Sequence, residues 1–285
     1  MVLRVLTVLL LLCLIVAAAS AAAPSAPSPR PYLALGDSVA FGFIDQAGFE
    51  YVNPNNFIGF PAYVGGALKL HDTNAACPGE TTGSFLSATA PDDGCRLFRS
   101  LAPLHVTNAS TQANFAGAFL KAHRQTRVVS VMLGANDLFL LERACLNDPT
   151  CIANGLSQVL AAVSTNMATI LGLIRSTGFK GVLIVENYYA LDYSDPGGVE
   201  LTQLLNQAVS APAASFGAVV ADLFTAFQTA TSTPFAGGNT CKAGLLNASP
   251  QNQFTCDVHP SQSGQQLIAR AVESAFAAAL RQAQD

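Results

Sequence analysis

The stretch LALGDSVAFG, residues 33–42, ends an apolar run that begins at Tyr32. An apolar run that meets Gly-Asp-Ser and then small residues is typical of a buried strand that turns sharply at the carboxyl edge of a sheet. Ser38 then stands on a rigid support, with its Oγ toward a cleft and its backbone N–H pointing inward. The alternative is that Asp37 or Ser38 only caps a following helix.

Further apolar runs predict the rest of the sheet. Strands are expected at residues 127–133, 181–185 and 218–222, each a short continuous run suited to a buried parallel strand. Helices are expected at residues 61–70, 114–123, 152–176, 199–209 and 263–281, and residues 71–112 are expected to be mostly loop. Strands that alternate with helices predict an α/β fold, a three-layer α/β/α sandwich around one parallel sheet.

The composition is that of a folded protein with a large core. Charged residues make up 11% of the 285 residues, hydrophobic residues make up 51%, and the net charge is −4. This balance argues against disorder, and without a basic run nucleic acid is not an expected partner.

The N-terminus has the features of a secretory signal. Arg4 precedes an apolar run at residues 5–19, and small residues follow at 19–21. We therefore expect a signal peptide at 1–21, a Pro/Ser-rich linker at 22–30 and one domain at 31–285, with secretion and no stable membrane insertion after cleavage. A retained membrane anchor is the alternative.

Six cysteines remain after the signal peptide. An even number in an exported protein indicates three disulfides, and pairing of sequence neighbours is the simplest expectation. The expected pairs are Cys77 with Cys95, Cys145 with Cys151, and Cys241 with Cys256. A zinc site is the competing interpretation, but the sequence has no Cys-x-x-Cys pair or His cluster, so we expect no metal.

One histidine differs from the other three. His259 lies beside Asp257 and just before the last predicted helix, whereas His71, His105 and His123 are expected at the surface. Asn136 directly follows the 127–133 run, so it shares the carboxyl edge of the predicted sheet with Ser38. His259 at a helix start, without any catalytic role, is the alternative.

Four segments together carry a resemblance. GDSV (36–39), Gly79, GAND (134–137) and DVHP (257–260) fall in the order of the four blocks of the SGNH, or GDSL-type, serine hydrolases. The resemblance covers residues 32 to about 270. It implies a three-layer α/β/α fold and ester hydrolysis without a cofactor.

The resemblance also implies roles. Ser38 is the implied nucleophile and His259 the base, and the oxyanion hole is formed by the backbone N–H groups of Ser38 and Gly79 with the Asn136 amide. The family's acid usually lies three positions before the histidine, where this chain has Cys256. Asp257 is the expected acid, and a backbone carbonyl near Cys256 is the alternative. Asp37 and Asp137 are expected to bond backbone near the site.

The substrate is expected to be a small-molecule or lipid ester, hydrolysed by a monomer acting as a lipase or esterase. Aromatic and aliphatic residues after Ser38 are expected to line an apolar pocket for a medium acyl chain: Phe41, Phe43, Ile44, Phe57 and Phe60. The alternatives are a carbohydrate O-deacetylase of the same fold and a catalytically silent, secreted binding module.

Overall fold

Five parallel strands form the centre of the fold. The computed structural model describes residues 28–107, 110–249 and 252–283, and the predicted signal peptide lies outside them. The strands are β1 (Pro31–Gly36), β2 (His71–Asn74), β3 (Val128–Met132), β4 (Val182–Glu186) and β5 (Ala218–Ala221). Their order in the sheet is β2-β1-β3-β4-β5, and all neighbouring pairs are parallel.

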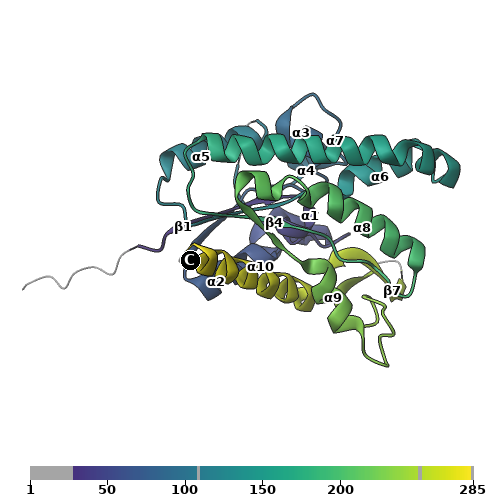
Figure 1. The fold of residues 1–285 in the computed structure, drawn as a ribbon. Coiled ribbons are helices and arrows are strands. Elements are labelled where there is room, and N and C mark those ends of the chain that lie inside the picture. The colour runs from purple at the N-terminus through teal and green to yellow at the C-terminus, as the bar shows by residue number, and fades with distance from the viewer. Residues whose placement is uncertain (1–27, 108–109, 250–251, 284–285) are drawn as a thin grey trace, which may run out of the picture.

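Helices cover both faces of this sheet (Figure 1). On one face α10 contacts α2, α9 and the strands β4 and β5, and on the other α7 contacts α3, α5, α6 and α8. The helices are α1 (Ser38–Phe41), α2 (Phe60–Leu68), α3 (Thr82–Leu86), α4 (Cys95–Leu101), α5 (Gln112–Ala122), α6 (Ala135–Ala144), α7 (Pro149–Ser176), α8 (Pro196–Ser210), α9 (Leu223–Thr231) and α10 (Gln262–Gln282). The predicted three-layer α/β/α sandwich is thus confirmed.

Burial explains why the apolar runs form strands. Every residue of β1 and β3 is buried, because helices cover both faces of the sheet at its centre. The long helix α7 buries one stripe, with Val163, Met167 and Ile170 among its members. In the described part of the chain, α7 alone is long and apolar enough to cross a membrane, and here it packs against α3, α5, α6 and α8.

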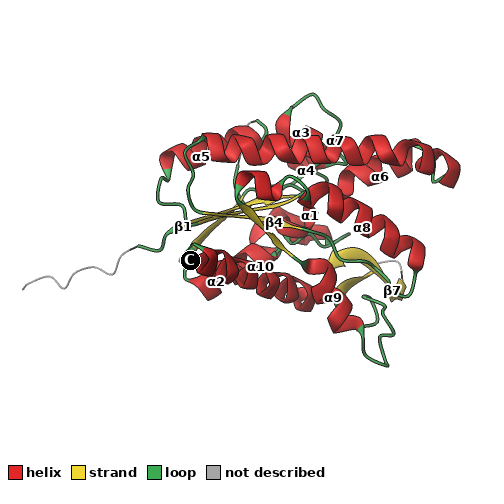
Figure 2. Cartoon of the chain, viewed as in Figure 1, coloured by secondary structure: helices red, strands yellow, loops and turns green. Residues whose placement is uncertain are grey.

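Several elements differ from the prediction, which placed no helix at α6 or α9. The edge strand β2 has the polar sequence HDTN, so no apolar run marks it, and residues 71–112 also contain α3 and α4 rather than loop alone. An antiparallel hairpin of β6 (Leu246–Ser249) and β7 (Asn252–Pro260) precedes the last helix (Figure 2). Short 3-10 helices also occur: η1 (Gly48–Val52), η2 (Pro54–Asn56) and η3 (Ala213–Phe216).

Candidate active site

Ser38 is the first residue of α1, directly after the turn that ends β1. The turn requires glycine at position 36, where φ is +153° and a Cβ would lie 2.6 Å from the carbonyl oxygen of Met132. The Asp37 carboxylate caps α1 by accepting the Val39 N–H at 2.9 Å. The strand therefore delivers Ser38 to the carboxyl edge of the sheet, as the sequence predicts.

Asp37, next to Ser38 in the chain, is buried. Its other oxygen accepts a hydrogen bond from the Tyr188 hydroxyl at 2.5 Å. Burial raises the pKa of Asp37 to about 6, while the bonds from Tyr188 and Val39 favour its ionised form. The expectation that Asp37 bonds backbone near the site is confirmed.

The hairpin brings His259 to Ser38. The Nε2 atom of His259 lies 2.9 Å from Ser38 Oγ, and its Nδ1 lies 2.6 Å from Asp257 Oδ1. The same Asp257 oxygen accepts the backbone N–H of His259 at 2.5 Å, which fixes a tight local turn. Asp257, two positions before the histidine, therefore occupies the orienting position that the sequence left open between this carboxylate and a backbone carbonyl.

Two neighbours hold the end of β7 that carries His259. The Tyr189 hydroxyl donates to the carbonyl oxygen of Val258 at 2.7 Å, and the Phe43 ring meets the His259 ring edge-on at 4.9 Å between centroids. The disulfide of Cys241 and Cys256 crosslinks β7 next to Asp257. Such support keeps an imidazole in one orientation.

Gly79 lies on a loop that is attached to the segment at residues 93–95. Its φ is +81°, and a Cβ there would lie 2.4 Å from the carbonyl oxygen of Asp93, so only glycine fits. The Gly79 carbonyl accepts the Asp93 N–H at 2.7 Å. The disulfide between Cys77 and Cys95 joins the same two segments, so the loop is doubly tied.

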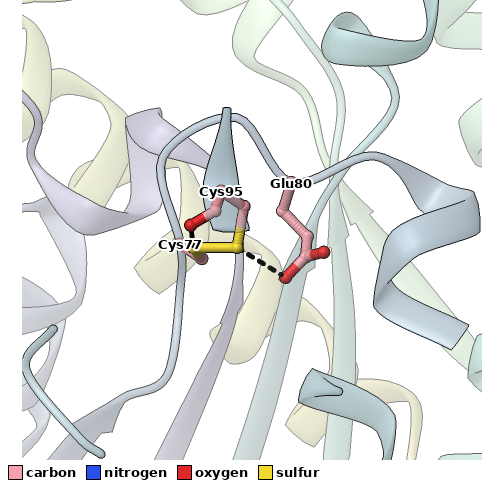
Figure 3. Close-up of side chains that lie close together, drawn as sticks. All are labelled: Cys77, Glu80 and Cys95. Carbon is pink, nitrogen blue, oxygen red and sulfur yellow. Dashed lines mark hydrogen bonds between the residues drawn. A yellow bond between two sulfur atoms is a disulfide. The ribbon is translucent and has the colours of Figure 1, made fainter. Parts of the chain in front are cut away.

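Glu80 lies beside the disulfide of Cys77 and Cys95 (Figure 3). Cys77, Glu80 and Cys95 place their ligand-type atoms within 4.8 Å, but the two sulfur atoms are bonded to each other and are not thiolate ligands. The buried Glu80 carboxyl instead accepts hydrogen bonds from Gln112 at 2.8 Å and from Ser84. Burial raises its pKa. The group therefore acts as a buried hydrogen-bonded support.

Asn136 stands at the start of α6 and lines both cavities that contain Ser38 and His259. Its Nδ2 donates to the carbonyl oxygen of Glu80 at 2.9 Å, and an amide has a second N–H for a ligand. The next residue, Asp137, accepts the N–H of Thr82 at 2.9 Å and the hydroxyl of Thr82 at 2.6 Å. The expected backbone role of Asp137 is confirmed, and it ties α6 to the Gly79 loop.

Two cavities meet at Ser38, Asn136 and His259. One, of about 270 Å³, lies between α6 and α8, and its walls include Leu138, Leu201, Leu205, Tyr188 and Tyr189. The other, of about 600 Å³, lies between α4, α6 and the end of β7, with Gly79, Phe43, Leu97 and Leu101 in its lining. The site thus combines a hydroxyl, an imidazole, a carboxylate and several N–H donors beside apolar space.

The comparisons with known proteins agree with this geometry. Residues 34–267 match the family model described as "GDSL-like Lipase/Acylhydrolase family". The chain belongs to the GDSL-like lipase/acylhydrolase family. Membership makes it a hydrolase that acts on esters, and it confirms the resemblance carried by the four segments. A search of curated proteins found no match.

Solved structures share the fold of this family member. Phospholipase A1 from Streptomyces albidoflavus NA297 is 19% identical with a TM-score of 0.57, covering 87% of this chain and 99% of that one. Axe2, an acetylxylan esterase from Geobacillus stearothermophilus, is 19% identical with a TM-score of 0.52, covering 87% and 94%. LAE5, an α/β hydrolase from the metagenome of Lake Arreo, Spain, is 15% identical with a TM-score of 0.54, covering 87% and 95%.

Two sequence expectations about the surroundings were wrong. Phe41, Phe57 and Phe60 are buried in the core, Ile44 lies outside both cavities, and only Phe43 of the five lines a cavity with Ser38. His105 is not at the surface: it is half-buried against Phe41 and bonds its carbonyl oxygen at 2.9 Å through Nε2. The remaining pair, His71 and His123, is exposed as expected.

The sequence interpretation missed Tyr188 and Tyr189. These consecutive tyrosines follow β4 at the same sheet edge as Ser38. The Tyr188 hydroxyl donates to Asp37, beside Ser38, and the Tyr189 hydroxyl donates to the carbonyl oxygen of Val258, beside His259. Their position within four residues of an apolar strand run, at the carboxyl end of that strand, is the signal that was available.

A buried carboxyl group at the end of β4 predicts that the free energy of unfolding depends on pH. Glu186, at the end of β4, is fully buried, and burial raises its pKa to about 8 from an ordinary value of 4.5, with Asp37 adding to the rise. The folded protein keeps this proton in a pH range where the unfolded chain has released it. Stability therefore falls as pH rises between these values, by up to about 1.4 kcal/mol per pH unit.

Replacing Glu186 with Gln removes this titration. We expect the Tm of Glu186→Gln, relative to wild type, to increase steadily as pH rises from 6 to 8 in thermal unfolding followed by circular dichroism. The comparison is made above pH 6 because Asp37 contributes in the same direction at lower pH. A Tm difference that stays constant over this range would show that Glu186 is ionised in the folded protein.

Proposed function

We propose that this family member is a serine-dependent carboxylic ester hydrolase that forms an acyl-enzyme on Ser38. The observation that carries the proposal is the continuous chain from Ser38 Oγ through His259 to Asp257, with separations of 2.9 and 2.6 Å. This chain opens onto two cavities, so a substrate carbonyl has room beside the hydroxyl.

The reaction follows from the positions of these atoms. His259 Nε2 takes the proton of Ser38 as Oγ bonds to the ester carbonyl carbon, and Asp257 stabilises the imidazolium that forms. The N–H groups of Ser38 and Gly79 and the Asn136 amide receive the negative oxygen. His259 then gives its proton to the leaving alcohol as the C–O bond breaks. Water repeats the sequence, with His259 as base, and releases the carboxylic acid.

The cavity between α6 and α8 favours a medium-length apolar acyl group. Leu138 and Leu205 are 6% and 4% exposed and Leu191 is 47% exposed, so this cavity is the more enclosed of the two. In the other, Leu97 and Leu101 are 64% and 77% exposed. The acyl group has to stay in place while the alcohol leaves and water enters. We therefore place the acyl group in the more enclosed cavity, between α6 and α8. The volume of 270 Å³ equals about nine water molecules of liquid, far more than an acetyl group needs.

The alternatives have less support. A carbohydrate O-deacetylase needs space for acetyl alone, and the leucine-lined cavity exceeds this. A silent binding module has no need of a serine, histidine and aspartate held in hydrogen-bond contact. We also propose that the protein acts after export, because the six cysteines form three disulfides.

Hydrolysis of a chromogenic ester series from acetyl to palmitoyl tests this function. We expect a maximum at medium chain length in wild type and loss of turnover in Ser38→Ala. Leu201→Trp, which fills the enclosed cavity, should move the maximum to shorter chains. Leu204→Trp is the matched control, because Leu204 lies on the same helix outside that cavity and is 37% exposed. A maximum at acetyl in wild type would favour the deacetylase, and no turnover would contradict ester hydrolysis.

A further inference from the structure

Helix α4 exposes two leucines at the mouth of the open cavity. Leu97 and Leu101 are 64% and 77% exposed and lie four residues apart, so they share one face of the helix. Both line the cavity that contains Ser38 and His259. Contiguous exposed apolar side chains mark interaction surfaces, so the neighbours of these two leucines decide what they are for.

Two other residues of α4 fix the helix to the body of the protein. Phe98 packs edge-on against Phe41 and Phe43, at 5.4 and 5.8 Å between ring centroids. Cys95, the first residue of α4, is bonded to Cys77 of the Gly79 loop. The helix is therefore held in place from within, and its two leucines are presented outward.

A second segment exposes apolar residues beside α4. Phe49 and Val52 of η1 are 94% and 76% exposed. Tyr51, between them, stacks on Phe43 at 5.8 Å and meets Phe98 of α4 at 5.9 Å, so η1 and α4 are neighbours.

A third segment completes the group. Leu146 is 88% exposed and has a left-handed φ of 50°, which a leucine rarely adopts. The next residue, Asn147, lines the open cavity, and the disulfide of Cys145 and Cys151 closes this turn. We name these five side chains the apolar rim: Phe49, Val52, Leu97, Leu101 and Leu146.

We propose that the apolar rim inserts into the surface of an aggregated lipid, so that ester molecules pass from the lipid phase into the open cavity. This inference rests on the proposed function. The rim borders the cavity that contains Ser38, and this position indicates what binds to it. A protein partner or a second copy of this chain seated on the rim would cover the entrance to Ser38, whereas a lipid surface supplies substrate through it.

The charges near the rim indicate which lipid headgroups it can approach. The exposed arginines Arg96 and Arg143 form ion pairs with Asp92 and Asp93, and Glu142 in the cavity lining adds negative charge. The whole chain also carries a net charge of −4. These charges do not attract an anionic surface, so the rim fits an uncharged or zwitterionic lipid.

Co-sedimentation with phosphatidylcholine vesicles tests the rim without hydrolysis. All variants carry Ser38→Ala, so the lipid stays intact. We expect this parent to bind, and the added pair Leu97→Ser and Leu101→Ser to weaken binding at least about tenfold. The matched control adds Leu173→Ser and Phe235→Ser, two exposed positions outside the rim with 45% and 83% exposure, and should bind as the parent does.

The outcomes separate the two proposals. A parent that does not bind vesicles, or equal binding by the rim and control variants, overturns the lipid-docking role even if wild type hydrolyses soluble esters. Binding that depends on Leu97 and Leu101 supports the rim even if ester hydrolysis is absent.

Discussion

Asp257→Asn is expected to lower kcat by about 10² to 10³ on a soluble ester, because a neutral amide does not stabilise the imidazolium that forms on His259. In the structure the carboxylate lies 2.6 Å from Nδ1 of His259 and also accepts the His259 backbone N–H. Asparagine keeps an oxygen that can accept that N–H, so the turn should survive. The effect should appear in kcat, with KM changed much less.

The control for this variant is Asp148→Asn. Asp148 caps α7 by accepting the N–H of Cys151 at 2.7 Å, lines neither cavity, and can be replaced by asparagine, which also caps helices well. Its kcat should match wild type. A kcat for Asp257→Asn within tenfold of wild type would mean that a backbone carbonyl, and not this carboxylate, orients His259.

Gly79→Ala is expected to lower kcat by about 10² to 10³, the usual loss for one oxyanion-hole donor. The new Cβ would lie 2.4 Å from the carbonyl oxygen of Asp93, in a backbone conformation of φ +81° that alanine rarely adopts. Since the disulfide of Cys77 and Cys95 prevents the two segments from separating, the loop has to turn its N–H away. Stopped-flow or steady-state assays on a soluble ester measure the loss.

Gly237→Ala is the matched control for backbone strain. Gly237 also has a positive φ, +57°, but a Cβ there has nothing within 4 Å, and it lines neither cavity. It should lose some thermal stability and keep its kcat. A wild-type kcat in Gly79→Ala, with the protein folded, would show that this N–H does not receive the oxyanion.

Much of this arrangement could be predicted from local patterns. The turn at Gly36 placed Ser38 at a sheet edge, and the short spacing of the cysteines anticipated their pairs. The edge strand β2 could not be found in this way, because HDTN lacks an apolar run and takes its strand form from pairing with β1. The hairpin that carries His259 was also missed. Its β6–β7 pairing has register shifts, so no regular alternation of residues marks it.

The shape of the substrate cavities was the least predictable feature. Aromatic residues after Ser38 suggested a pocket, yet Phe41 and Phe60 are fully buried in the core, and the enclosed cavity is built by α6 and α8 from later in the chain. Local sequence does not distinguish a core aromatic from a cavity wall, because both need apolar surface. Only the packing of distant segments decides which side chains face the empty space.

Covalent labelling by a fluorophosphonate tests the role of Ser38 most directly. Such a probe bonds to an activated serine, and mass spectrometry of the intact protein and its peptides locates the adduct. We predict one adduct on Ser38 in wild type, a much slower reaction in His259→Ala, and none in Ser38→Ala. An unlabelled but folded wild type, or equal labelling of Ser38→Ala, would contradict Ser38 as the nucleophile.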